Sequence, residues 1–364
     1  MAKVGRPAAI QAEHLEALRS IVAERRGATM DELCAELRRR TGVTVTTVTL
    51  RKTLVRAGLR RSATRVQRAA PVPTVTRYGY TQGHRRVAQA GKYASCLTDA
   101  EWALAADLFE RPAGRRGRPA KYERRSMVDA CCYVLRTGCA WRLLPRSFPP
   151  WLVVHKSFSR WAAQGKFEQL QQRLRAQWRQ RLERNAHPTA AIIDAQSTRI
   201  APQGGESGFD AGKKVKGRKR HLVVDTLGLL LAVSVTAASV QDRDAAPAAV
   251  ASACAKHTTI EKLFADAAYA GQCAQRLEHE LSIAVDIVRR PNAAGEWVNT
   301  QLPLWPAAGG FVVLPKRWVV ERTHAWTERC RRLVMHHDRS PRHAEAWVWL
   351  AQAGILLRRL AAAS

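Results

Sequence analysis

The chain has 364 residues, 46% of them hydrophobic, and its 60 Lys and Arg against 30 Asp and Glu give it a net charge of +30. This length favours two or three domains over a single core, and the apolar fraction excludes wholesale disorder. Such an excess of cations favours nucleic acid as a partner, and a membrane is the weaker alternative because the sequence has neither an apolar signal core nor a spanning run.

Residues 1–62 are predicted to form a helix-turn-helix DNA-binding domain. Three helices are expected, separated by short turns: 9–25, 29–40 and 44–57. The second helix opens with a capping box in which Thr29 and Glu32 satisfy free backbone N–H groups, and Gly42 can adopt the positive φ of the following turn. An ordinary three-helix bundle with solvated charges is the alternative. We assign DNA contacts to cations of the third helix: Arg51, Lys52 and Arg56.

A linker and a second helical domain are predicted next. Residues 63–92 are basic, contain no acidic residue and include two prolines, a composition typical of an extended linker. Residues 93–187 contain another capping box, from Thr98 to Glu101, and several amphipathic helices. This second helical domain either binds DNA or dimerises, and both alternatives stay open.

From residue 188 short apolar runs replace helical periodicity. Strands are expected at 191–193, 220–225, 229–237, 260–265 and 283–289, and helices at 245–257 and 272–281. Three sequential strands followed by alternating helices and strands is the order of a ribonuclease-H-like fold. The sequence therefore predicts an α/β protein: a mixed sheet with flanking helices over residues 188–364, preceded by two all-helical N-terminal domains.

Two of the predicted strands end at a carboxylate. Asp194 and Asp266 each follow an apolar run, where a carboxylate is costly to bury without a partner or a metal. Glu321, on a predicted helix, can supply a third carboxylate. Mg²⁺ prefers such ligands, and two ions about 3.5–4 Å apart suit phosphodiester cleavage. We therefore predict that Asp194, Asp266 and Glu321 are catalytic metal ligands.

The assignment of Glu321 has competitors. An ion pair with Arg317, four residues earlier, explains Glu321 equally well. Glu328 lies on the same helix face about 10 Å further along the axis, so only one of the two glutamates can reach the site, and we predict Glu321. The expected buried stripe of this helix is Val319, Thr323, Trp326, Cys330 and Leu333, and the opposite side is Arg317, Glu321, Glu328 and Arg332. The remaining candidate acids are ranked as turn residues or supports of the ligands: Asp210, Asp225, Asp242 and Asp244.

A dense cationic run, Lys213-Lys-Val-Lys-Gly-Arg-Lys-Arg220, precedes the second predicted strand. Such a run is usually a solvated tail, but its place beside the proposed site favours contact with a phosphate backbone. We assign DNA contacts to its six cations and to two arginines near Glu321: Lys213, Lys214, Lys216, Arg218, Lys219, Arg220, Arg317 and Arg329.

Eight cysteines are scattered over the chain, and no two have Cys-x-x-Cys spacing. Buried, reduced thiols explain this distribution better than a disulfide framework or a zinc site does. We therefore expect a soluble intracellular protein.

Five motifs follow one another through the predicted catalytic region: Ile193-Asp-Ala-Gln-Ser197, Gly217-Arg-Lys-Arg-His221, Val240-Gln-Asp-Arg-Asp244, Phe264-Ala-Asp-x-x-Tyr-Ala-Gly271 and Val313-Leu-Pro-x-Arg-Trp-Val-Val-Glu-Arg-Thr323. Two more lie in the second helical domain: Arg136-Thr-Gly-Cys-Ala-Trp-Arg-Leu-Leu-Pro145 and Pro149-Pro-Trp151. Together these motifs resemble the DDE transposases of insertion sequence family five, over about residues 93–338.

The resemblance implies cleavage and strand transfer at the inverted-repeat ends of an insertion sequence, with Asp194, Asp266 and Glu321 as the triad. It also implies two Mg²⁺ ions per site, with Mn²⁺ as a substitute, double-stranded DNA as the partner, a homodimer or higher oligomer, and a DNA-associated bacterial protein of the cytoplasm. Leu314 departs from the family's aromatic residue, and Glu328 stands where a basic residue is sometimes expected. The alternatives are a DNA-binding regulator with an inert catalytic domain and a metal-dependent nuclease without strand transfer.

Overall fold

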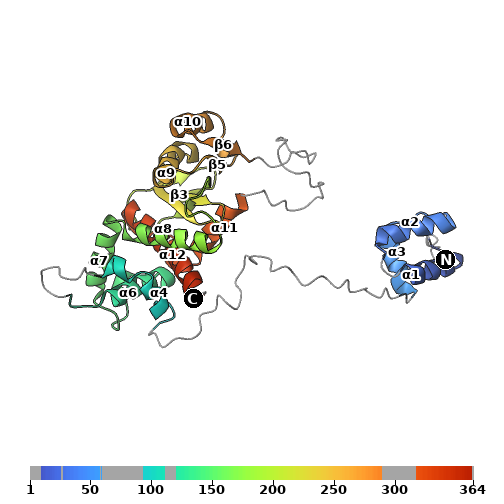
Figure 1. Ribbon diagram of the computed structural model, residues 1–364, viewed down its shortest axis with the longest axis horizontal. Coiled ribbons are helices and arrows are strands. Elements are labelled where there is room, and N and C mark those ends of the chain that lie inside the picture. The colour runs from blue at the N-terminus through green and yellow to red at the C-terminus, as the bar shows by residue number, and fades with distance from the viewer. Residues whose placement is uncertain are drawn as a thin grey trace, which may run out of the picture. The chain divides into compact units, whose positions relative to one another are not determined.

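The computed structural model describes residues 10–25, 28–57, 59, 93–110, 120–288 and 317–362. The chain divides into two units, residues 1–79 and residues 80–364, and each has its own hydrophobic core (Figure 1). The predicted linker, residues 63–92, lies outside the described residues.

The small unit contains three helices: α1 (Ala12–Glu24), α2 (Met30–Thr41) and α3 (Thr47–Arg56). The capping box predicted at the start of α2 is present, because Thr29 Oγ1 accepts from the backbone N–H of Glu32 and the Glu32 carboxylate accepts from that of Thr29. Gly42, at φ +74°, ends α2. The buried stripes of the three helices form one cluster: Ile10, Leu18, Ile21, Leu33, Leu37, Leu50 and Leu54.

The large unit is built on a six-stranded mixed sheet. Its strands are β1 (Ala190–Arg199), β2 (Gly208–Asp210), β3 (Val215–Asp225), β4 (Leu230–Ala237), β5 (Lys262–Ala265) and β6 (Ala284–Ile287). The order is β2-β3-β1-β5-β6, with β4 also paired to β3. Strands β1 to β4 pair antiparallel, whereas β1, β5 and β6 are parallel. The predicted ribonuclease-H-like mixed sheet is confirmed.

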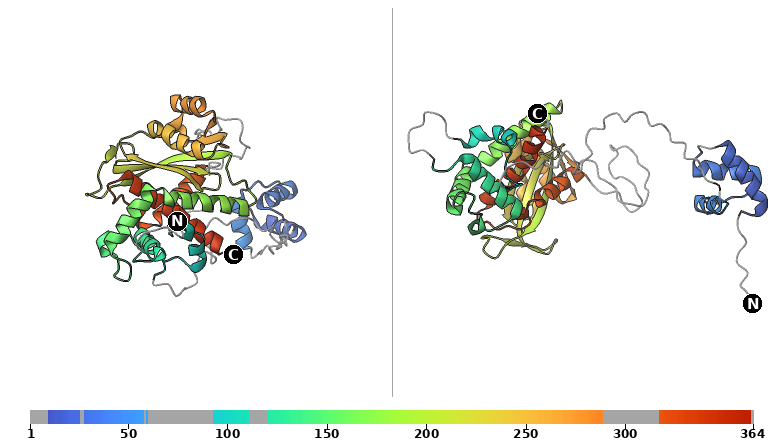
Figure 2. Two further views of the ribbon diagram at one scale, coloured as in Figure 1. Left: turned by 60° about the vertical axis from the view of Figure 1, so that its left-hand side comes forward. Right: turned by 90° about the horizontal axis from the view of Figure 1, so that it is seen from below.

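Helices cover both faces of this sheet (Figure 2). On one face lie α8 (Lys166–Arg181), α11 (Arg317–Glu328) and α12 (Pro341–Ala361), and on the other lie α9 (Asp242–Lys256) and α10 (Gln272–Leu281). Because strand side chains alternate between faces, Ile192 packs toward the first set of helices and Ile193 toward the second. Burying a side chain of this size contributes about 1.5–3 kcal/mol, so the alternation fixes the register of β1 firmly.

The helical region before the sheet consists of α4 (Asp99–Ala103), α5 (Ala106–Phe109), α6 (Arg124–Thr137), the short 3-10 helix η2 (Trp141–Leu143) and α7 (Trp151–Ala163). These elements share one hydrophobic cluster with the sheet face that α8, α11 and α12 cover. The ring centroids of Phe158 and Trp347 lie 4.0 Å apart, and those of Trp141 and Phe158 lie 5.7 Å apart. Residues 93–187 thus pack as part of the large unit's core.

Strand β3 begins at Val215, five residues before its predicted start, and two further strands differ from the sequence prediction. Strand β1 continues to Arg199, so Asp194 lies in the middle of a strand and not at its end. The reason is the antiparallel pairing with β3, which runs from Ala191 opposite Asp225 to Arg199 opposite Gly217 and carries polar positions into the strand. The second difference is β2, which is too short to leave a periodic signal and was not predicted.

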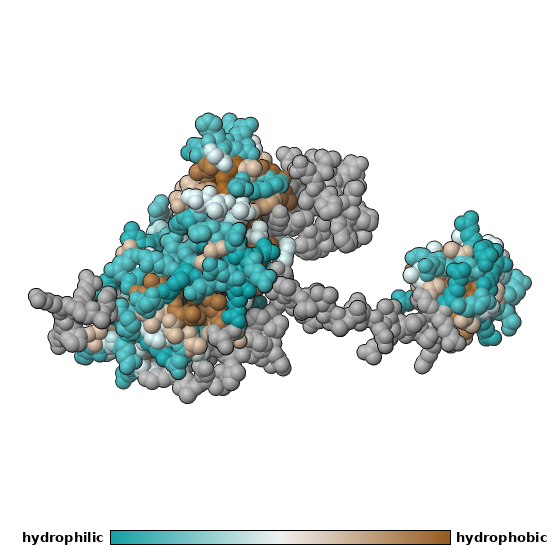
Figure 3. Space-filling model, viewed as in Figure 1, coloured by the Kyte–Doolittle hydropathy of each residue, from teal (hydrophilic) through white to brown (hydrophobic). Residues whose placement is uncertain are grey.

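No helix in the described part of the chain is both long and apolar enough to cross a membrane. All eight cysteines are free thiols, and two of them, Cys131 and Cys273, are buried while the other six are partly exposed. The surface of the large unit in Figure 3 is mainly hydrophilic, with one hydrophobic area near α9, β5 and β6 and another lower in the view, near α12.

Candidate active site

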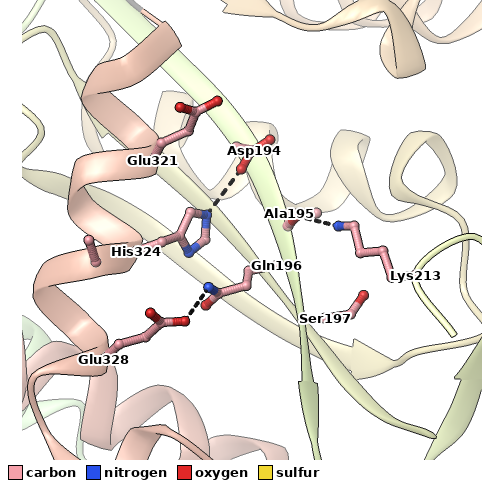
Figure 4. A pocket seen from close by; sticks show the side chains of 9 residues that line it. Asp194, Ala195, Gln196, Ser197, Lys213, Glu321, His324 and Glu328 are labelled. Atoms are coloured by element: carbon pink, nitrogen blue, oxygen red, sulfur yellow. Dashed lines mark hydrogen bonds and ion pairs between the residues drawn. The ribbon is translucent and has the colours of Figure 1, made fainter. Parts of the chain in front are cut away.

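One pocket of about 290 Å³ lies between β1 and α11 (Figure 4). It is lined by a stretch of β1, by one face of α11 and by a lysine of the segment before β3: Asp194, Ala195, Gln196, Ser197, Lys213, Glu321, His324, Ala325 and Glu328. Two of the three predicted catalytic carboxylates, Asp194 and Glu321, therefore reach the same pocket from different elements.

Helix α11 is fixed against the turn that joins β3 to β4. Thr323 donates its hydroxyl to the carbonyl oxygen of Gly228 at 2.8 Å, and Arg322 donates to the preceding carbonyl at 2.7 Å. Gly228 has φ +77°, and a Cβ there would lie 2.9 Å from Arg322 Nη2 and from Thr323 Oγ1, so the approach requires glycine. Docking on this side turns the opposite side of α11, with Glu321, toward β1.

His324 lies between Glu321 and Glu328 on the pocket side of α11 and is 5% exposed. Its Nε2 is 3.3 Å from Oδ2 of Asp194. Neither ring nitrogen has a hydrogen-bond partner among the described residues, so this contact has the distance of an ion pair without the geometry of a hydrogen bond. An imidazole at this distance restrains the orientation of the Asp194 carboxylate.

Asp266 does not line the pocket, but β5 brings it level with Asp194. Strands β1 and β5 pair in parallel with Ile192 opposite Phe264, and Asp194 and Asp266 each lie two residues further on. Strand alternation therefore puts both carboxylates on the sheet face that α11 covers. Asp266 Oδ1 accepts from the N–H of Ala268 at 2.9 Å and so caps the 3-10 helix η3 (Ala267–Tyr269).

The three predicted ligands do not form a closed cage. Within the described residues no three His, Cys, Asp or Glu side chains are gathered closely enough to hold a metal ion. The structure brings Asp194 and Glu321 to one pocket and leaves Asp266 at its neighbouring strand end.

Tyr269 lies close enough to Asp194 and Asp266 to interact electrostatically with both. Burial raises the pKa of its phenol well above the ordinary value, and the carboxylates of Asp194, Asp242 and Asp266 raise this pKa further. Its hydroxyl is buried and has no hydrogen-bond partner in the described part of the chain. Tyr269 is therefore a neutral phenol beside a group of carboxylates.

Glu328 lies at the other end of the pocket. Its Oε1 accepts from Nε2 of Gln196 at 2.6 Å, and Gln196 is two residues beyond Asp194 on the same face of β1 (Figure 4). Seven residues of helix separate Glu328 from Glu321, about 10 Å along the axis. Because Glu328 pairs with Gln196, the geometry favours Glu321 as the carboxylate that acts with Asp194.

Three lysines of the cationic run 213–220 are exposed: Lys213, Lys214 and Lys216. Lys213 donates its Nζ to the carbonyl oxygen of Ala195 at 2.9 Å and lines the pocket. Lys216 belongs to β3 and lies opposite Phe209 of β2. Of these three lysines, Lys213 brings positive charge to the pocket itself.

Arg218, in the same run, is buried in β3 and is 1% exposed. It donates to the carbonyl oxygens of Glu206, Asp338 and Arg339 at 2.8, 2.8 and 2.6 Å. The guanidinium thus ties β3 to two distant segments of backbone. Because those carbonyls occupy its donors, the predicted contact between Arg218 and DNA is corrected.

Lys219 and Arg220 are likewise buried. Lys219 pairs with Asp242 at 2.9 Å, and Arg220 donates to the carbonyl oxygen of Leu333. Burial lowers the pKa of Arg220 to about 10, and Glu328 partly offsets this effect. The predicted DNA contacts of these two residues are also corrected, since β3 pairs with a strand on each side and carries them into the interior.

The competing acids have structural partners. Asp225 accepts from Arg179 at 2.7 Å and from the backbone N–H groups of the β3–β4 turn. Asp210 accepts from the hydroxyl of Ser197 at 2.5 Å, and Asp242 pairs with Lys219. Asp244 is the exception and is exposed in the first turn of α9. The contacts of the other three acids give them structural roles.

The end of α11 differs from its prediction. The helix stops at Glu328, and a short 3-10 helix η4 (Arg331–Leu333) follows. Arg332 is 5% exposed and pairs with Asp338 at 2.9 Å, so it does not lie on an exposed side beside Glu321. Because the helix type changes after residue 328, residues 330–333 do not continue the α-helical spacing on which the predicted faces of α11 were based.

Of the two arginines predicted near Glu321, Arg329 is exposed just after α11, and its carbonyl oxygen accepts from Arg136 at 2.9 Å. Arg317 begins α11, and its side chain lies outside the described residues. In the small unit, Arg51, Lys52 and Arg56 are all exposed on α3.

Sequence reasoning missed two pocket residues, His324 and Gln196. The signal for His324 is spacing, because residues 321, 324, 325 and 328 follow the i, i+3, i+4, i+7 pattern of one helix face. The signal for Gln196 is alternation, because it is two residues beyond Asp194 on a strand that proved longer than its apolar run.

Two family models match the chain. A model described as "Transposase DDE domain" matches residues 185–357, which include β1, β5, α11 and the whole pocket. A model described as "Putative transposase of IS4/5 family" matches residues 97–171, in the helical region before the sheet. No curated protein matches the chain.

Proposed function

Because the chain belongs to the DDE transposases of the IS4/IS5 group, we propose that it binds the inverted-repeat ends of an insertion sequence and catalyses metal-dependent cleavage and strand transfer there. The family makes it a DNA transposase in general terms. The observation that carries the finer proposal is the convergence of Asp194 and Glu321 on one pocket, with Asp266 level with Asp194 on the adjacent parallel strand.

The donor chemistry of the proposed triad fits Mg²⁺. This ion prefers carboxylate oxygens and keeps several waters, so two or three acidic side chains on rigid elements are sufficient ligands. We propose that Asp194, Asp266 and Glu321 hold two Mg²⁺ ions, for which Mn²⁺ can substitute. When bound, the ions supply the charge stabilisation and the activated oxygen nucleophile that phosphodiester cleavage needs.

Other side chains of the pocket position these ligands. His324 restrains the Asp194 carboxylate from α11, at 3.3 Å. The hydrogen bond between Gln196 and Glu328 braces α11 against β1 at the far end of the pocket. Since a misplacement of about 1 Å can cost a hundredfold in rate, these two contacts between helix and strand support the proposed chemistry.

Two cationic surfaces support the proposed DNA binding. The exposed lysines at 213, 214 and 216, of which Lys213 lines the pocket, suit the phosphate backbone of the bound DNA. The exposed cations of α3 suit the major groove, into which the later helix of a helix-turn-helix enters. We further propose that the active complex contains two or more copies of the chain, because two DNA ends are cut and joined.

The test uses the full-length protein and a linear duplex that carries the inverted repeats flanking its gene, with MgCl₂. We expect nicks at the repeat ends and joined products, both abolished by EDTA. Asp194→Asn, Asp266→Asn and Glu321→Gln should each lower cleavage more than about 100-fold, because loss of a ligand exceeds the 10- to 100-fold cost of losing a ligand's support. Each should still bind the ends.

Glu328→Gln is the matched control, since it changes the same functional group about 10 Å further along the helix. Its amide oxygen can still accept from Gln196, so the variant should keep most activity. Cleavage that survives in Glu321→Gln and is lost in Glu328→Gln would show that the wrong turn of α11 was chosen. Nicks without joined products would make the protein a nuclease. End binding with no cleavage under any metal condition would make it a regulator.

A further inference from the structure

Phe209 stands apart from the other aromatic side chains. It is 57% exposed, and no other Phe, Tyr or Trp of the described residues is exposed to a comparable extent. A single exposed apolar side chain is common on protein surfaces, so the surroundings of Phe209 decide whether its ring has a ligand.

The strand that carries Phe209 is held firmly. Asp210, the next residue, accepts from the hydroxyl of Ser197 at 2.5 Å and from the backbone N–H of Lys213 at 3.0 Å. On the other side, Gly208 packs so closely that a Cβ would lie 2.3 Å from the hydroxyl oxygen of Ser239. Phe209 is thus presented by an anchored strand between two packed residues, and binding to it would cost little conformational entropy.

The charge around Phe209 is positive. Its cross-strand partner in β3 is the exposed Lys216, and the exposed Lys213 and Lys214 lie in the connection between β2 and β3. The one acidic residue of β2, Asp210, is buried. An aromatic ring among exposed lysines is the combination that binds single-stranded nucleic acid, where bases stack on the ring and cations hold the phosphates.

The sheet register relates Phe209 to the pocket. Asp194 pairs with Leu222 of β3, and Phe209 pairs with Lys216, which lies six residues before Leu222 on the same strand. Since six is an even number, alternation puts Phe209 and Asp194 on one face of the sheet. At roughly 3.3 Å per residue, the two positions are about 20 Å apart along β3, which is the length of about six stacked nucleotides.

From these observations we propose that Phe209, with Lys214 and Lys216, forms a stacking site for an unpaired base of the DNA strand, about six nucleotides from the bond that is cut. The inference rests on DNA being the substrate of the proposed function. The ring supplies a flat apolar surface for the base, and the lysines supply the contacts to the phosphates on either side of it.

The test measures binding of the full-length protein to fluorescently labelled dT12 and to a 12-base-pair duplex, by anisotropy over a range of salt concentrations. Phe209→Ala should weaken dT12 binding about tenfold, the effect of losing one stacked base. It should change duplex binding less than about twofold and leave the salt slope unaltered, because no cation is removed.

Two further substitutions separate stacking from simple apolar contact. Phe209→Trp keeps an aromatic face and should bind dT12 at least as well as the unchanged protein, whereas Phe209→Leu keeps apolar volume without the ring and should bind like Phe209→Ala. Leu143→Ala, which removes another exposed apolar side chain, 73% exposed, is the matched control and should have no effect.

Equal dT12 binding by Phe209→Leu and the unchanged protein, or an equal loss with single-stranded and duplex probes, would overturn the proposal. So would unchanged dT12 binding by Phe209→Ala. Cleavage at the repeat ends by the unchanged protein would still support the proposed function in each of these cases, so the two ideas fail separately.

Discussion

Helix α3 and the run 213–220 are both rich in cations, and the two regions use them differently. On α3 the cations share the exposed face with Val48 and Val55, while Leu50 and Leu54 pack inward. In the run, the first three cations are exposed and the last three are buried in β3, where they contact backbone carbonyls and a carboxylate. The comparison teaches that cationic composition indicates a nucleic-acid surface only where neighbouring elements leave the cations uncovered.

The largest effect is expected from the exposed half of the run. Changing Lys213, Lys214 and Lys216 together to Ala should lower the slope of log K against log salt for duplex DNA by about 2.7, at roughly 0.9 per phosphate contact. At 0.1 M salt this corresponds to binding about 500-fold weaker, with preference for the ends retained. Arg276→Ala, on α10 across the sheet, is the control and should leave the slope unchanged. An unaltered salt slope in the triple variant would show that these three lysines do not contact the duplex.

Arg218→Met should separate the buried half of the run from the exposed half. It leaves three carbonyl oxygens without their donor, so we expect a loss of about 3 kcal/mol in the free energy of unfolding, measured in urea. The salt slope of the folded variant should equal that of the unchanged protein. A lower slope with full stability would mean that Arg218 contacts DNA after all.

Helix α3 should govern preference more than overall affinity. Replacing Arg51, Lys52 and Arg56 by Ala should reduce the ratio of end binding to random-sequence binding by about 10- to 100-fold, since a base contact discriminates by about 1–3 kcal/mol. Deleting residues 1–62 should have the same consequence. Arg39→Ala is the control, because Arg39 pairs with Glu36 at 2.6 Å within the same unit. An equal loss of preference for the ends when Lys213, Lys214 and Lys216 are changed to Ala would contradict the separate roles expected for α3 and for the run 213–220.

The smallest expected effect concerns the pH dependence of stability. It tests how completely the buried half of the run 213–220 is shielded from water. Burial lowers the pKa of His336 to about 2, and Arg220 and Arg218 add to this effect. The unfolded chain takes up a proton near its ordinary pKa of about 6.5, so stability is full above that pH and falls as pH drops below it. Between pH 7 and pH 5 we expect His336 to account for a loss of about 1–2 kcal/mol in urea unfolding, and the buried His221 and His257 to add to it. His336→Gln should reduce the pH dependence by the share of His336, and an equal pH dependence in the variant would contradict the assignment.

Much of the fold followed from local signals in the sequence. The capping box at Thr29 and Glu32 and the glycine after α2 were readable because their partners lie within three or four residues. The apolar runs in β1 and β5 marked Asp194 and Asp266 for a similar reason, since a strand that is buried on both faces leaves an unbroken hydrophobic run.

The tertiary structure decided which charged residues face outward. Arg218 is satisfied by carbonyls of residues 206, 338 and 339, and no local pattern shows that such distant backbone will surround it. In the same way, His324 faces Asp194 only because Thr323 and Arg322 dock α11 on the β3–β4 turn. Hydrophobic periodicity and capping act over a few residues and can be read from the chain, whereas the burial of a charge and the completion of a pocket depend on partners from 12 to 121 residues away or more.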